Sequence, residues 1–536
     1  MGSRPLTLDT AARADQRVQV AGRPLSADRI LWAAAVAVVG VALLLVYERL
    51  SATAPVTADS ANAVLQGRAM AGGNLLLHGW TLSGASFVAT DLPFYGLIAA
   101  VRGVSPAVAH DAGAAIYTLL VLSACFLARG PARGSHALVR MGIALILLVA
   151  PAPGDVAQLM LLGPFHVGTT LFLVLALLLV DQAPDRLHRI VAIWALLTLA
   201  VLSDTLALYV GVIPLVIVCA LRLPGRRLAA GAGWPEGGVL AAALLAPPAA
   251  AALEGTLHGL GGFTTVPLQA AFSQLEDLPT NMQLTIEGIF LVFGADFFRE
   301  PVGAGTLAAL VRLIGLVFVA AVWWRSLRSW RRGEHLDLIT QVLVVGMAVD
   351  VAAYLFSNQA IDLRTSRYLV PLLVFGAVLA ARRGAGWLWD GHLRVPALAA
   401  GMAYAGVLAV SLQTPPAVNS EAAVGDFLQK QHLTSGVSGY WEASTVTVAT
   451  SGRVHVRAID VRNDGAHPYR WEAEDSWYDS TAPGNDARFV LRDTSGLQPL
   501  GRQLTVAAFG PPSREYRVGR YEVLVWDRNL MEDLRG

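Results

Sequence analysis

The chain has 536 residues, of which 55% are hydrophobic and 15% are charged, and its formal net charge at pH 7 is +1. This composition and a positive mean hydropathy predict an integral membrane protein and exclude a soluble or disordered chain. The balanced charge gives no support to nucleic-acid binding, and we expect no nucleic-acid partner. The two cysteines, Cys125 and Cys219, lie in apolar runs and indicate neither a disulfide nor a metal site.

Apolar runs of suitable length predict about eleven transmembrane helices. The first run is too long for the apolar part of a cleaved signal peptide and is followed by many others, so we expect it to remain in the membrane. The predicted spans are residues 30–48, 108–128, 137–151, 164–181, 189–203, 205–221, 237–253, 303–324, 336–356, 367–382 and 395–411.

Arginines are concentrated in alternate loops between these spans. Cytoplasmic loops of membrane proteins carry an excess of basic residues, so this pattern predicts a cytoplasmic tail over residues 1–29 and a multi-pass plasma-membrane protein. The long loops 49–107 and 254–302 and the C-terminal residues 412–536 are then predicted to lie outside. The arginines on the cytoplasmic side are Arg4, Arg13, Arg17, Arg23, Arg29, Arg129, Arg133, Arg140, Arg186, Arg189, Arg222, Arg226, Arg227, Arg325, Arg328, Arg331, Arg332, Arg382, Arg383 and Arg394.

The C-terminal residues 412–536 are polar and have a different periodicity. Alternating apolar residues in TVTVAT (445–450), RVHVRAIDV (453–461) and REYRVGRYEVLVW (514–526) predict strands, and EAAVGDFLQKQHL (421–433) predicts a helix. The predicted fold class is therefore mainly α: a polytopic membrane domain over residues 30–411, followed by a small extracytoplasmic α/β domain.

The predicted outer loops hold most of the candidate functional groups. Ionisable side chains near the hydrocarbon boundary are costly unless they face a cavity or a partner, so their collection on one side predicts one outward-facing polar cavity. The candidates are Asp59, Asp91, His166, Asp204, Arg364, Arg367 and Tyr368.

Each candidate also has a structural alternative. Asp59 lies in the first turn of a predicted amphipathic helix on the outer leaflet, where an acidic residue can simply cap the helix. Asp204 can cap the sixth span, and His166 can be a satisfied interfacial histidine. Arg364 and Arg367 lie in a predicted outer loop, whereas most arginines lie in the predicted cytoplasmic loops. They are suited to bind a phosphate bidentately, with anchoring at the membrane interface as the alternative.

Common soluble-enzyme motifs are absent from the sequence. It has no Walker loop, HExxH, GxSxG or dinucleotide fingerprint, which excludes the usual soluble-nucleotide chemistry on the cytoplasmic face.

Three segments together resemble the GT-C glycosyltransferases, in particular the protein mannosyltransferase and aminoarabinose transferase type and its actinobacterial members. They are ADSANAVLQGRAMAGGNLLLHGW followed by TDLPFYGLIAA, SRYLVPLL (366–373) and GVSGYWEASTVTVATSGRVHVRAID. The chain departs from the family pattern at Ser60, where many members have a second acidic residue. The usual Lys-Pro-Pro element is also absent, with Thr90 to Pro93 in its approximate place.

The resemblance implies a polyprenyl-phosphate sugar donor, contact with membrane lipids, and a glycan, lipid or protein acceptor. Asp59 would be the general base of an inverting transfer, and Arg364 and Arg367 would bind the departing phosphate. Asp91 and Asp204 would orient sugar or acceptor hydroxyls. No cofactor is required, although a divalent cation between carboxylates is compatible with the pattern.

Aromatic residues of the C-terminal domain add a candidate sugar-stacking surface, with packing in the domain core as the alternative. These residues are Tyr440, Trp441, Trp471 and Trp477.

Two other functions fit the sequence. One is a lipid or sugar transporter or flippase, although no internal repeat is visible and the ionisable groups lie at one surface. The other is an assembly or sensor protein that retains this fold without activity.

Overall fold

The computed structural model describes residues 27–182, 186–226, 235–298, 301–389, 393–496 and 500–535. Most of the predicted cytoplasmic tail, with its four arginines before residue 27, lies outside these residues. The chain divides into two compact units, Met1–Leu43 and Leu44–Gly536. The C-terminal domain and most of the helices therefore belong to one unit, and the candidate site lies wholly within it.

All eleven predicted spans coincide with helices, which confirms a mainly α, multi-pass membrane protein. Among the described residues, seven helical segments are long and apolar enough to cross a membrane. They are α1 (Ala27–Ser51), α4 (Pro106–Arg129), α10 (Pro235–Gly259), α12 (Ala304–Arg331), α13 (Leu338–Phe356), η3 (Leu363–Leu369) continuing into α14 (Val370–Trp389), and α15 (Arg394–Ser411).

The other four predicted spans are shorter apolar helices. They are α5 (Gly134–Leu148), α7 (Val167–Asp181), α8 (Leu187–Ser203), and the π-helix η1 (Leu208–Val212) continuing into α9 (Ile213–Arg226). The predicted long outer loops contain further helices: α2 (Ala58–Ala71), α3 (Leu92–Arg102), η2 (Leu275–Asp277) and α11 (Leu278–Val292). Helix α6 (Asp155–Leu161) lies in the short loop between the third and fourth predicted spans.

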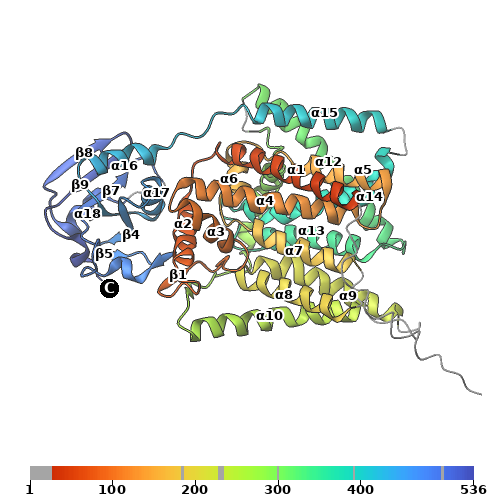
Figure 1. Cartoon of the computed structure of the whole chain (residues 1–536), viewed down its shortest axis with the longest axis horizontal. Helices are drawn as coiled ribbons and strands as arrows, with labels where there is room; N and C mark the ends of the chain where they lie inside the picture. Colours follow the sequence, from red (N-terminus) through yellow and green to blue (C-terminus); the bar gives the residue numbers. More distant parts are fainter. Residues whose placement is uncertain are drawn as a thin grey trace, which may run out of the picture. The chain divides into compact units, whose positions relative to one another are not determined.

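Helix α2 forms where the sequence predicts it, but it is not an amphipathic helix with one face in water. It packs against α3 and against α17 (Tyr440–Ala449) of the C-terminal domain (Figure 1). Its polar residues Ser60, Asn62 and Gln66 are buried together with its apolar ones. The prediction of an amphipathic helix is therefore wrong, because protein covers the face that was expected to be polar and solvated, while its place on the outer leaflet stays a prediction.

A small sheet joins three segments that are far apart in the sequence. Strand β1 (Trp80–Leu82) pairs in parallel with β2 (Thr264–Thr265) and antiparallel with β6 (Ala473–Glu474). The two long loops and the C-terminal domain are thereby connected through backbone hydrogen bonds beside the candidate site.

The C-terminal domain is α/β, as predicted. Its six-stranded sheet has the order β5-β4-β3-β7-β9-β8, with β3 parallel to both β4 and β7 and a hairpin formed by β8 and β9. Apolar side chains from alternate strand positions form separate cores on the two faces of this sheet. The elements are β3 (Ser435–Ser438), β4 (His455–Arg462), β5 (Gly465–Pro468), β7 (Phe489–Asp493), β8 (Arg514–Val518), β9 (Tyr521–Val525), α16 (Ser420–Lys430), α18 (Arg502–Phe509), η4 (Asp475–Tyr478) and η5 (Leu530–Asp533).

Most local predictions for this domain are confirmed, namely the helix α16 and the strands β4, β8 and β9. The predicted strand over 445–450 is wrong, because these residues belong to the end of α17 and its cap. Neighbouring parallel strands need a crossover, and α17 provides it between β3 and β4. The hydroxyls of Thr447 and Thr450 bond back to the carbonyls of Ala443 and Val446, which satisfies β-branched polar residues inside a buried helix.

Candidate active site

A cavity of about 1130 Å³ lies between the start of α2, the turn before α7, the 3₁₀ helix η3 and the C-terminal domain. Six of the seven candidate residues line it: Asp59, His166, Asp204, Arg364, Arg367 and Tyr368. The predicted polar cavity is therefore present, and it brings together residues more than 300 positions apart in the sequence.

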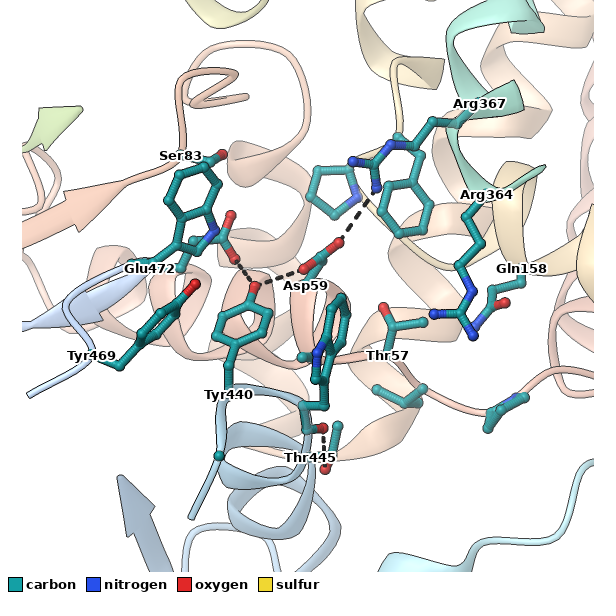
Figure 2. Close-up of a pocket in the computed structure, with 18 of the residues that line it drawn as sticks. Thr57, Asp59, Ser83, Gln158, Arg364, Arg367, Tyr440, Thr445, Tyr469 and Glu472 are labelled. Atoms are coloured by element: carbon teal, nitrogen blue, oxygen red, sulfur yellow. Dashed lines mark hydrogen bonds and ion pairs between the residues drawn. The ribbon is translucent and has the colours of Figure 1, made fainter. Parts of the chain in front are cut away.

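Asp59 projects from the first turn of α2 into this cavity, and its carboxylate is partly exposed. The helix is capped by Thr57, whose Oγ1 accepts a hydrogen bond from the Ser60 amide at 3.1 Å. The capping alternative for Asp59 is thus taken by another residue. Asp59 Oδ1 accepts a hydrogen bond from the Tyr440 hydroxyl at 2.6 Å, and Oδ2 lies 3.5 Å from Arg367 Nη1 (Figure 2).

Glu472, which sequence reasoning missed, supplies a second carboxyl group at this point. Its Oε2 lies 3.1 Å from the Tyr440 hydroxyl and accepts a hydrogen bond from Asn62 Nδ2 at 3.2 Å. The side chain lines the cavity, but the residue is only 8% exposed. Burial, reinforced by the charge of Asp59, raises the pKa of Glu472 to about 8.

The 3₁₀ helix η3 presents two arginines to the cavity. Asp362 fixes its start, because Oδ1 accepts hydrogen bonds from the amides of Arg364 and Thr365. Side chains three residues apart share a face in a 3₁₀ helix, so Arg364 and Arg367 point the same way. The Arg367 guanidinium also lies over the Phe165 ring, 4.9 Å from its centroid.

Arg364 differs from Arg367 because its guanidinium forms no ion pair with another described residue. Figure 2 shows its side chain directed to the same part of the cavity as Gln158 and Thr57. Among the residues that the structure describes, its guanidinium has no ion-pair partner, whereas Arg367 is paired with Asp59. A guanidinium without an ion pair in a cavity is suited to bind an anion.

His166 and Asp204 form a buried pair in the cavity wall. His166 Nδ1 lies 2.7 Å from Asp204 Oδ2, while Asp204 Oδ1 accepts a hydrogen bond from the Leu206 amide at 2.9 Å. Asp204 therefore caps the turn before η1, as its structural alternative predicted, and also orients the histidine. His166 has a left-handed backbone with φ of 68°, and its ring lies 4.5 Å from that of Tyr368.

Asp91 is absent from the residues that line the cavity and is 0% exposed. Its carboxylate accepts a hydrogen bond from Thr90 Oγ1 at 2.8 Å and packs against Gly168 in the first turn of α7, where a Cβ would clash with it. Burial raises its pKa to about 7. The geometry does not support the predicted role for Asp91, because its carboxylate is packed against α7 and does not line the cavity.

The four aromatic candidates separate into two groups. Tyr440, Trp441 and Trp471 line the cavity. Trp477 packs in the core against Trp80, with ring centroids 5.1 Å apart. The stacking prediction therefore concerns only the first three, and core packing accounts for the fourth.

Within the described parts of the chain, no group of three or more His, Cys, Asp and Glu side chains is placed to hold a metal ion. Asp59 and Glu472 are bridged by the Tyr440 hydroxyl rather than arranged as a ligand set. The expectation that no cofactor is required remains a prediction.

No family model matches this chain, and no curated protein sequence matches it. Among solved structures, it is similar to a crystal structure of the Archaeoglobus fulgidus oligosaccharyltransferase in complex with zinc and sulfate. That match has 13% sequence identity and a TM-score of 0.46, and it covers 85% of this chain and 68% of the other. At this level the similarity carries no inference about activity.

Proposed function

We propose that this protein is a GT-C-type membrane glycosyltransferase that transfers a sugar from a polyprenyl-phosphate donor to an acceptor at the outer leaflet. The observation that carries the proposal is the cavity, in which an accessible carboxylate, Asp59, lies opposite the arginines of η3. This combination provides a base for a hydroxyl nucleophile and cations for a phosphate leaving group.

The proposed reaction is a direct displacement. The acceptor oxygen attacks the anomeric carbon while Asp59 takes the hydroxyl proton, and the bond from that carbon to the phosphate oxygen breaks. The phosphate leaves with the electron pair, and the anomeric centre is inverted. Asp59 Oδ2 is suited to receive the proton, because Oδ1 is already bonded to Tyr440.

The two arginines have different parts in this proposal. Arg364 binds the donor phosphate first, because its guanidinium is not occupied by an ion pair. Arg367 begins paired with Asp59 at 3.5 Å, a long contact that a phosphate can replace as charge develops on the leaving group. Their separation by three residues allows both to reach one phosphate.

The orientation is also part of the proposal. Arginine clusters lie at the loops on the other side of the predicted spans, so the positive-inside rule assigns the cavity and the C-terminal domain to the outside of the plasma membrane. A lipid-linked donor suits this location, since its polyprenyl chain remains in the bilayer while its phosphate and sugar enter the cavity. The walls from the C-terminal domain, with Trp441 and Trp471, are then available to the acceptor.

The test is transfer from a radiolabelled polyprenyl-phosphate sugar in membranes containing Asp59→Asn. We expect the rate to fall by about 10²–10⁴-fold, the usual contribution of a general base. Asp155→Asn is a matched control, since this exposed residue also lies in the first turn of an outer helix but does not line the cavity. Unchanged transfer in Asp59→Asn would exclude the base assignment. Absence of transfer by the wild-type protein would instead favour the transporter or the inactive assembly protein.

A further inference from the structure

The hydrogen bonds around Tyr440 require more protons than the tyrosine has. Its hydroxyl oxygen lies 2.6 Å from Asp59 Oδ1 and 3.1 Å from Glu472 Oε2, and each contact needs a hydrogen atom between its two oxygens. A phenol supplies one hydrogen. The second must be carried by one of the two carboxyl groups.

The surroundings of the two carboxyl groups decide which one carries it. Asp59 is partly exposed to the cavity and lies 3.5 Å from the Arg367 guanidinium, so its carboxylate has both water and a cation beside it. Glu472 is buried, and no arginine or lysine is hydrogen-bonded or ion-paired to it in the described structure. The arrangement is therefore a Glu472 acid that donates to Tyr440, while Tyr440 donates to an ionised Asp59.

Burial and the charge of Asp59 raise the pKa of Glu472 and outweigh the neighbouring hydrogen-bonding groups Asn62, Tyr440 and Ser83, which each lower it. Asp59 and Asn62 face it from α2, Tyr440 from α17, and Ser83 from the segment after β1. Tyr469 also lies near enough to interact with its charge. Burial, with Glu472 and Asp59 beside it, raises the pKa of Tyr440 well above its usual value, so the phenol keeps its proton.

The backbone at Glu472 is held in an uncommon conformation. Its φ is 52°, in the left-handed region that residues with a Cβ rarely adopt. The next two residues, Ala473 and Glu474, are fixed by pairing with Thr81 and Trp80 of β1. Such conformations persist only where the surrounding structure enforces them, and they cluster at functional sites.

We propose that Glu472 is a positioning residue delivered by the C-terminal domain, a carboxylic acid that directs the Tyr440 proton toward Asp59 and so holds the base ionised with Oδ2 facing the acceptor. This inference rests on the proposed glycosyl transfer. It assigns the second acidic group of the site to a residue that lies 413 positions after Asp59 in the chain, in place of Ser60.

The arrangement predicts an alkaline limit to transfer. When Glu472 loses its proton, two carboxylates compete for the single Tyr440 hydrogen, and Asp59 is no longer held in one orientation. The donor is a phosphodiester, which does not titrate in this range. We expect the wild-type rate to fall by about tenfold from pH 7 to pH 9.5, as expected for loss of one hydrogen bond to a charged group.

The decisive variant is Glu472→Gln, because an amide remains neutral at all these pH values and can still donate to Tyr440. We expect it to transfer within about threefold of the wild-type rate at pH 7 and to lose the alkaline fall. Asp475→Asn is the matched control. This exposed residue lies three positions later, does not line the cavity, and should keep the wild-type pH profile.

An alkaline fall in Glu472→Gln equal to that of the wild type would overturn the proposal, as would loss of transfer at pH 7 in a variant that still folds. If Glu472→Gln does not fold, Tyr440→Phe decides. We expect it to be about tenfold slower at pH 7 with little further fall at pH 9.5, and a wild-type rate and profile would overturn the proposal. Wild-type protein that transfers no sugar contradicts the proposed function, whereas transfer with an unaltered profile in these variants contradicts only the role of Glu472.

Discussion

Two charged regions of this protein use arginine and aspartate in opposite ways. At the cytoplasmic side of the predicted topology, the buried Arg382 donates two hydrogen bonds to Asp181 at 3.0 and 3.1 Å, one to Asp337 at 3.0 Å and one to the Leu127 carbonyl. At the cavity, Arg367 approaches Asp59 only at 3.5 Å and its Nε has no hydrogen-bond partner in the described structure. Arg364 has no ion pair there at all.

The difference separates a charge cluster that connects helices of the fold from cavity arginines that bind a phosphate in the proposed function. The Arg382 cluster connects α4, α7, α14 and the cap of α13, and its guanidinium is largely satisfied by these four hydrogen bonds. Removing one member of such a cluster leaves a buried charge without a partner. Arg364 and Arg367 are less completely paired, so substituting them should have little effect on the fold but, under the proposed function, a large effect on donor binding.

The strongest challenge to this comparison is Arg382→Ala. We expect a loss of about 3 kcal/mol of stability, because the mostly buried Asp181 loses both of its hydrogen bonds from Arg382, whereas Asp337 is half-exposed and Arg140 still lies near both carboxylates. Thermal unfolding in detergent measures the effect, and Arg331→Ala, at an exposed position, is the control. The transfer rate per folded molecule should be retained. A stable but inactive Arg382→Ala would show that the two regions are not independent.

Arg364→Ala should give the reverse result. We expect KM for the polyprenyl-phosphate donor to rise by about 10–100-fold, corresponding to the roughly 1.5–3 kcal/mol of a hydrogen bond to a charged group. The unfolding temperature should not change, since no ion pair is lost. Arg364→Lys should recover part of the affinity, because it keeps the charge but not the bidentate geometry. An unaltered KM would place the phosphate elsewhere in the cavity.

Asp91→Asn sharpens the comparison, because Asp91 was a candidate site residue but does not line the cavity and is packed against Gly168 of α7. Its folded pKa of about 7 is above the usual aspartate value near 3.9, so folding favours the protonated form. The stability that this group contributes is complete below pH 3.9 and is lost as pH rises toward 7, by about 1.4 kcal/mol per unit. We expect the wild-type protein to lose about 2 kcal/mol between pH 5 and pH 7 relative to Asp91→Asn, measured by thermal unfolding at each pH. Identical pH dependence of both proteins would contradict this packing role.

Much of the membrane architecture could be predicted from the sequence, because long apolar runs have few alternatives to a helix. The C-terminal domain shows where such reasoning ends. The alternation over 445–450 has the period of a strand, but the need to cross between the parallel strands β3 and β4 makes it part of a helix. That requirement depends on strand pairing, which the local pattern does not reveal.

The candidate site residues that lie next to apolar spans could be predicted from the sequence. Asp59, Asp204, Arg364 and Arg367 were found because charged groups beside hydrocarbon need an explanation. Glu472 gave no such signal, since it lies in a polar domain with many other acidic residues. Asp91 is, like Asp59, an acidic residue in the first predicted outer loop. Its carboxylate is nevertheless packed against α7, where Gly168 leaves room for it. Only the packing of the helices shows that Asp59 lines the cavity and that Asp91 does not.

The small β1-β2-β6 sheet also has a consequence for biosynthesis. Strand β6 follows Glu472 directly, and its partner β1 is made almost 400 residues earlier. A ribosome therefore inserts every predicted span before the last strand of this sheet exists. The cavity stays incomplete during nearly the whole of translation. Asp59 is therefore made and placed in its predicted outer loop before Tyr440 and Glu472 have been synthesised. The candidate site is therefore complete only after the C-terminal domain has been made.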